Sequence, residues 1–366
     1  LLERMNQGEG LSLPELSVLL AYVKIDLYDR LISTDLPEEL YLESVLVNYF
    51  PTPLRGTYPL AMNNHRLRRE IIITELTNGM VNRAGITFAY RMNEETAASP
   101  AEIARAYIII REIFGLAGLW DEIEALDGQV DSEIQQSVYF DSRKLLERAV
   151  RWIIQNRPSP LSIDQNVERY MSMMQYLSTI LVTRIDQQQH KNAQAKTMRL
   201  VKAGVPESLA IRVATFDALS FGMELVETAL ATQIDLDAVV AVYFQTGERL
   251  QLNWLRNSIS DLPRNTHWQA IARGTLRDDL LELHNQITTE VLYSVPANAE
   301  ADALDSWIEH NKKQADHCFQ LISELNSGSA PDYTMLSVVL RELRRLVQKT
   351  PYSTTISHIP AAGGVW

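Results

Sequence analysis

The chain has 366 residues, of which 46% are hydrophobic and 22% are charged. The length allows two or three ordinary domains or one large helical body. The composition is typical of a soluble globular protein and is too apolar for a disordered chain. The formal net charge of −12 argues against nucleic acid or an anionic membrane as a partner, because both bind a basic surface.

Cys318 is the single cysteine, so an intrachain disulfide and a cysteine-rich zinc site are excluded. We expect its side chain to be a small buried hydrophobe in a cytoplasmic protein. No apolar run approaches the roughly 18 residues of a membrane span, so no membrane partner is expected. The chain starts at Leu1 without Met or a signal-peptide pattern, and we expect a piece of a longer protein.

Helix signals follow one another from the start of the chain. Ser12-Leu-Pro-Glu15 resembles a capping box ahead of "LSVLLAYVKIDLYDRLI", and Ser99-Pro-Ala-Glu102 is a second one ahead of "IARAYIIIREIF". Pro37 opens the helix "EELYLESVLVNYF", which ends before Pro51. Pro59 is expected to start the long helix that contains residues 67–86.

The rest of the chain keeps the helical period. We expect helices near 116–127, 134–157, 164–202, 206–231, 235–258, 266–294, 300–326 and 332–349. The tail at 351–366, "PYSTTISHIPAAGGVW", has no helical period and is expected to be irregular. No strand pattern occurs, so the fold is predicted to be an all-α multi-helix bundle without a sheet. We expect two packed helical sub-bundles, at 1–160 and 161–350.

Residues 67–86, "LRREIIITELTNGMVNRAGI", do not sort into an apolar and a polar side. A helix that is apolar all round is usually buried, and burying an unpaired polar group costs roughly 1–3 kcal/mol. We therefore expect its polar side chains to have partners, either within this fold or on another domain. The candidates for such structural or inter-domain contacts are Arg68, Arg69, Asn78, Asn82 and Arg83.

Thr74, Asn78 and Asn82 form a row along this helix, each one turn from the next. Such a row binds either a neighbouring backbone or a ligand, and we favour the structural role. Gly79 costs about 1 kcal/mol of helix propensity relative to alanine. We infer that another backbone approaches the helix closely at this glycine.

Motifs of nucleotide-binding and hydrolytic enzymes are missing from the sequence. It contains no G-x-G-x-x-G turn, no Walker A loop, no H-E-x-x-H and no G-x-S-x-G. We therefore expect no catalytic, cofactor-binding or metal-binding residue in this chain.

Asp278, Asp279 and Glu282 are the strongest exception to that expectation. Carboxylates at this spacing on a helix can share a magnesium ion that faces a diphosphate. No second acidic motif accompanies them, so a solvated acidic face balanced by Arg277 is the preferred interpretation.

Histidines and aromatic residues indicate packing more than chemistry. His310 and His317 lie seven residues apart, whereas chelation on a helix uses a spacing of four, so solvated or capping side chains are favoured. Core packing is also the preferred role for Tyr243, Phe244 and Trp254.

Long blocks of the sequence carry a family resemblance: "LSLPELSVLLAYVKIDLYDRLISTDLPEE", "HRLRREIIITELTNGMVNRAGITFAYRMNEETAASPAEIARAYIIIREIFG", "LERAVRWIIQNRP", "AGVPESLAIRVATFDAL", "VVAVYFQTGERLQLNWL" and "HWQAIARGTLRDDL". In this order, across residues 10–290, they resemble the C-terminal helical region of the large bacterial NAD-specific glutamate dehydrogenases. The sequence departs from the family pattern at Gly79, where an acidic residue is usual.

The resemblance implies an activity that this chain does not carry alone. The whole enzyme of that family oxidatively deaminates L-glutamate to 2-oxoglutarate and ammonia with NAD, in a catalytic domain upstream of the matching region. The catalytic lysine, the catalytic aspartate and the glycine-rich turn of that domain have no matching positions here. No catalytic or NAD-binding residue is therefore carried over.

We expect a C-terminal helical domain that is inactive alone. Its expected partner is the upstream catalytic domain of the same polypeptide, in a homo-oligomer, and it would support that domain, the oligomer or regulation. Two alternatives stay open: a self-contained α-helical enzyme that uses magnesium and a diphosphate, and a helical scaffold without a catalytic role.

Overall fold

The computed structural model describes residues 8, 10–294, 303–328 and 330–347. Within these ranges the chain forms helices and connecting turns and contains no strand, which confirms the all-α multi-helix prediction. None of the helices found there combines the length and the apolar character that crossing a membrane requires. The tail predicted at 351–366 lies outside the described residues.

The chain divides into two compact units, which are described separately. Unit 1 comprises Leu1–Tyr176 and Ala193–Met223, and unit 2 comprises Leu177–Asn192 and Glu224–Trp366. The sub-bundle boundary expected at residue 160 stays a prediction, because a grouping by contacts does not establish which segments fold independently.

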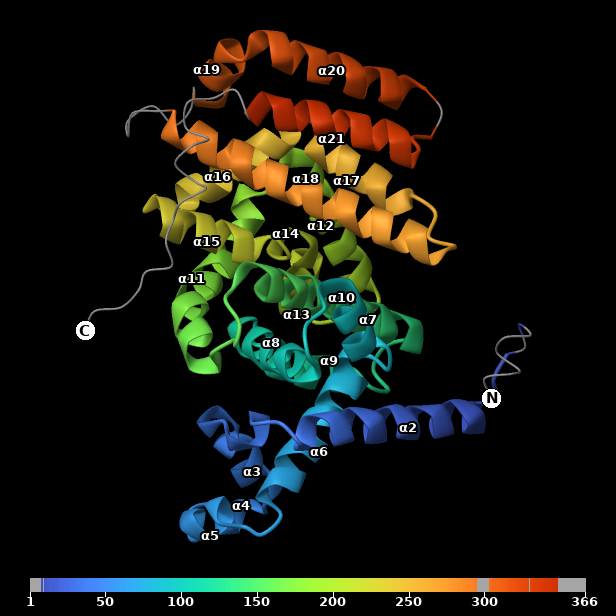
Figure 1. The fold of residues 1–366 in the computed structure, drawn as a ribbon, viewed down its shortest axis with the longest axis vertical. Coiled ribbons are helices and arrows are strands. Elements are labelled where there is room, and N and C mark those ends of the chain that lie inside the picture. The colour runs from blue at the N-terminus through green and yellow to red at the C-terminus, as the bar shows by residue number, and fades with distance from the viewer. Residues whose placement is uncertain (1–7, 9, 295–302, 329, 348–366) are drawn as a thin grey trace. The chain divides into compact units, whose positions relative to one another are not determined.

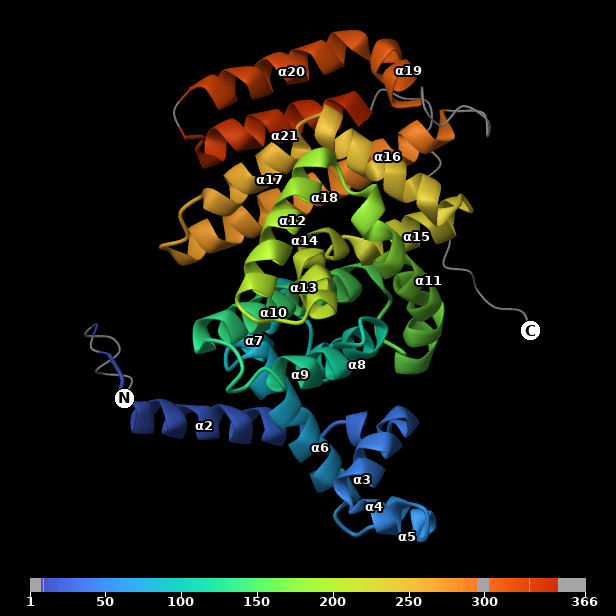
Figure 2. The ribbon, with the colours of Figure 1, turned by 180° about the vertical axis from the view of Figure 1, so that it is seen from behind.

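Unit 1 contains the elements from α2 to α10, parts of α11 and α12, and two short helices that follow (Figures 1 and 2). Their bounds are α2 (Leu13–Ile32), the 3-10 helices η1 (Leu36–Glu38) and η2 (Leu40–Leu42), α3 (Glu43–Tyr49), α4 (Thr52–Arg55), α5 (Pro59–Asn63), α6 (Arg68–Gly79), the π-helical η3 (Met80–Ala84), α7 (Phe88–Thr96), α8 (Pro100–Ile113), α9 (Leu116–Glu124), α10 (Ser132–Asn156), α11 (Ile163–Arg184), α12 (Gln187–Lys202), α13 (Glu207–Ala214) and α14 (Phe216–Leu219).

Both segments predicted as capping boxes lie at helix starts, but only the first is a complete box, because the Glu102 carboxylate accepts instead from Ser159 Oγ and the Leu161 N–H. Ser12 and Glu15 form a reciprocal box at the start of α2. At the start of α8 the Ser99 hydroxyl accepts from the Glu102 backbone N–H at 3.2 Å, which satisfies one of the free donors of the first turn.

Two predicted long helices are interrupted. The helix expected from Pro59 is wrong as one element, because α5 and α6 are separated by a turn in which His65 Nδ1 accepts from the Leu67 N–H at 3.2 Å. The helix expected at 164–202 breaks between α11 and α12. There the Asp186 carboxylate accepts from the Gln189 N–H at 2.8 Å, so Asp186 starts a new helix.

Helix α8 is the most completely buried helix of unit 1 and packs against α2, α7, α9 and α10. Among its alanines and isoleucines lies one charged side chain, Arg105, which is 5% exposed. Arg105 Nε donates to Glu39 Oε1 and Arg105 Nη2 donates to Asp35 Oδ1, each at 2.9 Å. A guanidinium buried without such partners would be strongly destabilising.

The same short segment is also bound to α6. Glu38 pairs with both Arg68 and Arg69. Arg69 Nη2 also donates to the carbonyls of Ile32 at 2.7 Å and Thr34 at 3.1 Å. Three arginines from two helices therefore hold residues 32–39, which extend from the end of α2 through η1.

These pairs make part of the stability depend on pH. The Arg105 hydrogen bond lowers the pKa of Asp35, and hydrogen bonds from Arg69 and then Arg68 lower the pKa of Glu38. The folded state therefore binds protons less readily than the unfolded state does. Both carboxylates therefore contribute to the free energy of unfolding at neutral pH, and this contribution is lost as the pH falls through their lowered pKa values.

Unit 2 contains residues 177–192, most of α15 and all the helices that follow. Their bounds are α15 (Gly222–Thr232), α16 (Leu236–Arg249), α17 (Leu252–Asp261), α18 (His267–Tyr293), α19 (Ala303–His310), α20 (Lys312–Ser327) and α21 (Tyr333–Val347).

Three helices expected in the second half of the chain are split. The helix expected at 206–231 is divided into α13, α14 and α15, and the one at 300–326 into α19 and α20. The helix expected at 235–258 breaks between α16 and α17 at Gln251, whose φ of 54° lies in the left-handed region. A hydrophobic period that continues across each break gives no signal of it.

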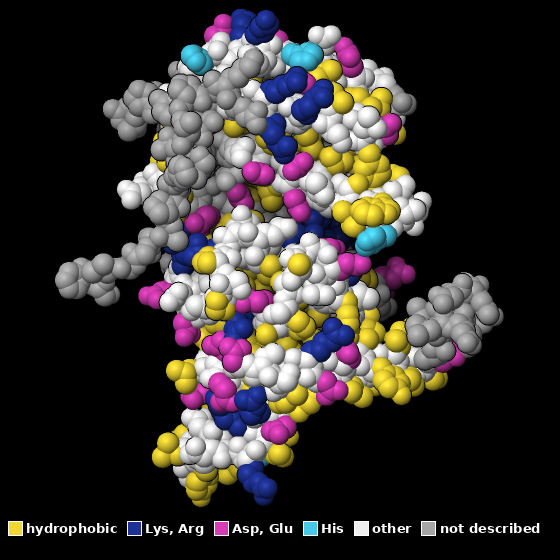
Figure 3. Space-filling model, viewed as in Figure 1, with side chains coloured by type: hydrophobic (Ala, Val, Ile, Leu, Met, Phe, Trp, Pro, Cys, Tyr) yellow, Lys and Arg dark blue, Asp and Glu magenta, His cyan; other side chains and the backbone are white. Residues whose placement is uncertain are grey.

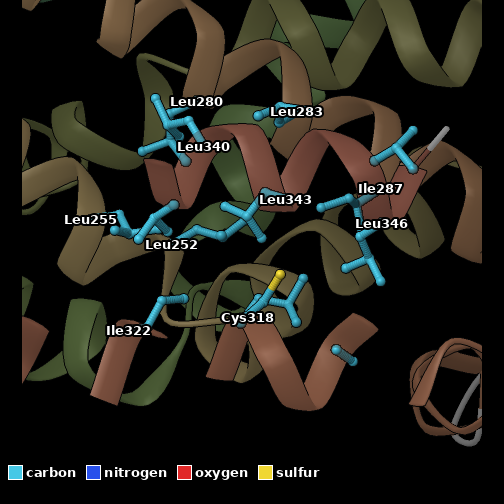
Figure 4. Packing of buried hydrophobic residues seen from close by; sticks show 14 of the residues in the cluster. Leu252, Leu255, Leu280, Leu283, Ile287, Cys318, Ile322, Leu340, Leu343 and Leu346 are labelled. Carbon is cyan, nitrogen blue, oxygen red and sulfur yellow. The ribbon is translucent and has the colours of Figure 1, made fainter. Parts of the chain in front are cut away.

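Helix α18 is central in unit 2 and packs against α16, α17 and α21. Figure 4 shows the core that these helices share with α20, in which Cys318 belongs to the same cluster as leucines of α17, α18 and α21. Cys318 is 1% exposed, and burial raises the pKa of its thiol to about 11, so its predicted role as a small buried hydrophobe is confirmed.

A neutral histidine lies in the same unit. His284 is buried, its ring stacks on Tyr243 with centroids 3.7 Å apart, and its Nε2 faces the Tyr243 carbonyl at 2.8 Å. Burial lowers the pKa of His284 to about 3, so Nε2 carries the single proton and donates it to that carbonyl. A Cβ on Gly247 would stand 3.1 Å from the imidazole, which explains a glycine there.

We expect the partners of Arg105 to matter more than the arginine itself. Replacing Asp35 by Asn and Glu39 by Gln leaves a buried guanidinium without a carboxylate. This should cost about 2–3 kcal/mol, most of it at Glu39 because Asp35 is largely exposed. Arg105→Met removes the charge together with its need for partners and should cost less.

Native-state hydrogen exchange of the α8 amides measures this difference within unit 1. The α8 amides of the double variant should exchange roughly 30- to 150-fold faster than those of the wild type. The exchange rate in Arg105→Met should lie between these two rates. An Arg105→Met variant that exchanges faster than the double variant would contradict the assignment.

Candidate functional site

Residues 67–86 lie partly buried and partly open to solvent. Ile71, Ile72 and Ile73 are buried where α6 packs against α2, η1 and α3. Thr74 and Glu75 are exposed. The expectation of a helix buried all round is therefore wrong, and the helix that is buried in this way is α8. Because Ile71, Ile72 and Ile73 are consecutive, they point to different sides of α6 and pack against several neighbours. The side that carries Thr74 and Glu75 is exposed to solvent.

The arginines of this segment have partners within unit 1. Arg68 and Arg69 bind Glu38, as described above. Arg83 Nη2 lies 2.5 Å from Glu124 Oε1 on α9, and Arg83 Nη1 donates to the Tyr139 hydroxyl at 3.3 Å. Whether any of these arginines also serves another domain stays a proposal.

The row predicted along the helix lies on its open side. Thr74 and Asn82 are exposed and Asn78 is half-buried. Among the described residues, neither amide side chain has a hydrogen-bond partner, so the row holds no backbone within this structure. Its binding capacity is available to another molecule or to another part of a longer chain.

The backbone changes its winding directly after Gly79. Residues Met80–Ala84 form a π-helical turn, and Gly85 ends it at φ 99°, with the Arg143 guanidinium packed where a Cβ would stand. Short π-helical turns inside helices are rare and recur at functional sites. Here the turn carries Arg83 toward α9 and places it beside Trp120.

A cavity of about 240 Å³ opens beside this turn, between α6, η3, α8 and α9, and we call it the α6–α9 cavity. Its apolar wall is formed by side chains from four helices, and its polar wall by two arginines and two carboxylates. The apolar wall consists of Val45, Leu76, Tyr107, Ala117 and Trp120. The polar wall consists of Glu75, Arg83, Arg111 and Asp121, and Gly79 completes the lining.

The aromatic side of the cavity is rigid and buried. Tyr107 and Trp120 are 1% and 4% exposed, and their rings stack with centroids 6.4 Å apart at 13°. The Arg83 guanidinium lies over the Trp120 ring, 5.3 Å from its centroid. Burial raises the pKa of Tyr107 to about 12, so its hydroxyl keeps its proton. The buried Trp120 Nε1 has no hydrogen-bond partner in the described structure.

Gly79 has a different role from the one predicted. A Cβ at this position would meet only the Tyr107 hydroxyl, at 3.4 Å, and the backbone is ordinary right-handed helix. The inference of a closely approaching backbone is therefore wrong for the described structure. The missing side chain leaves space in the α6–α9 cavity.

The acidic motif on α18 does not form a metal site in this structure. Asp278 is bound by its neighbour Arg277, Asp279 by Arg344, and Glu282 accepts from Gln286. Across the described residues, no group of three or more His, Cys, Asp or Glu side chains is arranged to hold a metal ion. Two of the three carboxylates of this motif are thus paired with arginine, and the absence of a metal site stays a prediction.

Apart from Gly79 and Arg83, sequence patterns did not single out the cavity residues, and they did not single out Arg105. Tyr107 and Arg111 lie in an isoleucine-rich run that is typical of a core helix. Trp120 and Asp121 lie one helix further on, so only the fold brings the four together. The single available signal was Gly79, a glycine inside a helix without a turn to explain it.

Comparison with known families decides which family these helices represent. The family model for the C-terminal region of glutamate dehydrogenase matches residues 8–345. The chain belongs to this family. The match includes the polar segment, the α6–α9 cavity and both units, and it confirms the resemblance found from the sequence blocks.

Individual relatives agree with this assignment. The chain is 35% identical over 357 residues to an NAD-specific glutamate dehydrogenase of Pseudomonas aeruginosa and 34% identical over 349 residues to one of Halomonas elongata. It is 29% identical over 346 residues to one of Mycobacterium tuberculosis. These matches cover 97%, 95% and 94% of the chain, but only 22%, 22% and 21% of the relatives. The chain spans about a fifth of their length.

We expect Gly79→Ala to stabilise unit 1. Alanine is favoured over glycine by about 1 kcal/mol in a helix, and the added Cβ makes an ordinary contact, so the free energy of unfolding should rise by about 0.5–1 kcal/mol. Native-state hydrogen exchange of α6 measures the change.

Gly85→Ala is the matched control within the same segment. It should destabilise the unit by more than 1 kcal/mol, because of its positive φ and the Arg143 guanidinium in that space. A loss of stability in Gly79→Ala would show that an approach we have not identified requires the glycine.

Proposed function

We propose that this chain is the C-terminal helical domain of an NAD-specific glutamate dehydrogenase and that it supports a catalytic domain elsewhere in the same polypeptide. The observation that carries the proposal is the coverage, since nearly all of this chain matches about a fifth of each relative. The whole enzyme would oxidatively deaminate L-glutamate to 2-oxoglutarate and ammonia and pass the hydride to NAD.

The described residues do not fit NAD. A dinucleotide pyrophosphate binds a glycine-rich turn between a strand and the N-terminus of a helix. The described ranges contain no strand, and the sequence contains no such glycine-rich turn. The nucleotide and glutamate sites of the proposed enzyme would therefore lie in the remainder of the polypeptide.

Helix α2 offers the surface through which this domain would contact that remainder. Only Leu27 and Leu31, near its C-terminal end, are buried. Along the rest of the helix, apolar side chains are exposed, and Figure 3 shows hydrophobic side chains gathered along it. We call this surface the α2 stripe: Leu13, Leu16, Val18, Tyr22 and Ile25. Exposed apolar side chains concentrated on one helix in this way are typical of an interaction surface.

The occupant we propose for the α2 stripe is the catalytic part of the same polypeptide. Helix α2 is the first helix of the matched region, so in a longer chain it would be the helix nearest to the preceding domain. The open row of Thr74 and Asn78 on α6 and Asn82 on η3 supplies hydrogen-bonding groups, and α6 packs against α2. A homo-oligomer and a cytoplasmic location belong to the same proposal.

The two alternatives have less support. The magnesium and diphosphate enzyme requires free carboxylates on α18, and all three have protein partners. A scaffold unrelated to catalysis does not account for the shared name of the relatives. A reading frame that continues upstream into a glycine-rich strand–turn–helix pattern would exclude the scaffold.

Coexpression of the chain with the polypeptide encoded upstream of it, as two separate chains, tests the proposal. The two should copurify and together form NADH from glutamate and NAD, whereas the 366-residue chain alone should form none. Leu16→Glu with Tyr22→Glu places two charges in the α2 stripe and should abolish copurification and NADH formation.

Leu60→Glu with Tyr58→Glu is the matched control. These side chains are also exposed, at 77% and 56%, but they lie at α5, away from the stripe. Turnover by the 366-residue chain alone would contradict a catalytic domain elsewhere. An equal loss in the control variant would contradict docking at α2.

A further inference from the structure

The Tyr107 hydroxyl is a polar group on a buried side chain and has no partner within the protein. The residue is 1% exposed, and its hydroxyl makes no hydrogen bond to any of the described residues. A Cβ on Gly79 would stand 3.4 Å from this oxygen, and both residues line the α6–α9 cavity. The oxygen therefore faces the space that the glycine leaves. Native proteins leave few buried polar groups without a hydrogen bond, so this one indicates a bound molecule.

Two carboxylates of the same cavity are also without partners. Glu75 on α6 and Asp121 on α9 line it, and neither carboxylate has an ion-pair or hydrogen-bond partner among the described residues. Both residues are open to solvent, which keeps the cost of these free charges low. Three oxygen-bearing side chains from three helices are thus available to a molecule that enters the cavity.

The two arginines of the cavity do not neutralise these carboxylates. Arg83 Nη2 lies 2.5 Å from Glu124 Oε1, and Arg111 Nη2 lies 2.6 Å from Glu112 Oε1. Each guanidinium is therefore already paired with a carboxylate that does not line the cavity. The charges that remain unpaired around the cavity are negative, so it attracts a cation and repels an anion.

The rest of the lining is apolar and restricts the kind of cation. Val45, Leu76, Ala117 and Trp120 form this part of the wall. It suits a short hydrocarbon chain better than a hydrated inorganic ion, which binds a shell of oxygen ligands. The volume of about 240 Å³ is below the roughly 300–1,000 Å³ of pockets for drug-sized ligands, so the occupant is small.

We propose that the α6–α9 cavity binds a primary ammonium group carried on a short apolar chain. An ammonium group has three N–H donors, and the cavity offers three acceptors in Glu75, Asp121 and the Tyr107 hydroxyl. Burial raises the pKa of Tyr107 to about 12, so its oxygen stays neutral and accepts through a lone pair. The hydrocarbon chain packs against Leu76 and Trp120.

Two kinds of molecule present this group. One is a free alkylamine, and the other is a lysine side chain of the polypeptide to which this domain belongs. The same three acceptors and the same apolar wall recognise both.

Ligand-observed NMR on the 366-residue chain tests the proposal, with n-butylammonium as the probe. Three related molecules each lack one feature: n-butanol has no charge, butyrate has the opposite charge, and the ammonium ion has no chain. At constant ionic strength, butylammonium should bind at least about tenfold more tightly than any of the three.

Substitutions in the cavity should weaken the binding of butylammonium. Glu75→Gln and Asp121→Asn should each lower the affinity by about tenfold, because each removes one of the charges that attract the ammonium group. Tyr107→Phe should lower it by about threefold to tenfold, and it breaks no hydrogen bond of the protein. Gly79→Leu should abolish binding, because its side chain fills the space beside the hydroxyl.

Two matched controls separate the cavity from the net charge of the molecule. Asp127→Asn in the turn after α9 and Glu133→Gln in α10 change the charge by the same amount. Both side chains are exposed and lie outside the lining, so neither substitution should change the affinity. Circular dichroism and hydrogen exchange of the α8 amides show whether each variant is folded. If Gly79→Leu does not fold, the two carboxylate variants at exposed positions carry the test.

A second arm distinguishes the two sources of the ammonium group. The same titration is made on the polypeptide that includes the upstream sequence. If a lysine of that polypeptide occupies the cavity, butylammonium should no longer bind. If the natural occupant is a free amine, butylammonium should bind with the affinity measured on the 366-residue chain.

The proposal is overturned if butylammonium does not bind the 366-residue chain, or if butanol or butyrate binds it as tightly. It is also overturned if binding survives in the folded Glu75→Gln and Asp121→Asn double variant, or if the two controls weaken it equally. Glutamate oxidation is not measured in this experiment. Its outcome is therefore independent of the proposed function.

Discussion

The buried guanidinium of Arg105 is the constraint on which the N-terminal part of unit 1 depends. It lies within α8, the helix that four others surround, and it has to be neutralised there by Asp35 and Glu39. Both carboxylates come from the short segment after α2, and Glu38 between them binds α6. The segment that neutralises the charge on α8 is thereby also bound to α6, so the ion pairs link α8, the end of α2 and the polar segment at 67–86.

Helix existence and fold class were predictable from the sequence because apolar period and caps are local signals. The start of α8 at Ser99 and the length of α18 are examples. Breaks inside long periodic stretches were not predictable. At Gln251 a left-handed residue turns the chain although the hydrophobic period continues, and at Asp186 one carboxylate starts a new helix. Neither residue type by itself indicates a break.

The partners of the residues at 67–86 and the lining of the α6–α9 cavity were likewise not predictable from the sequence. Sequence reasoning selected Arg68, Arg69 and Arg83 because a buried helix needs its charges paired, and all three have carboxylate partners. Their partners come from elements that are 30 to 41 residues away in the chain, so only the fold could name them. The cavity was hidden for a related reason. Its lining combines residues from helices that appear separately to be core or surface, and only the unexplained Gly79 indicated that space was needed there.

Hydrogen exchange of residues 13–25 and 67–86 shows whether the remainder of a longer polypeptide covers the α2 stripe, when the 366-residue chain is compared with the polypeptide that includes the upstream sequence. If the stripe is covered, α2 and the open face of α6 exchange at least about tenfold more slowly in the longer polypeptide, while α8, already buried, changes little. Equal exchange of residues 13–25 in both proteins would contradict coverage of the stripe by the remainder of the polypeptide.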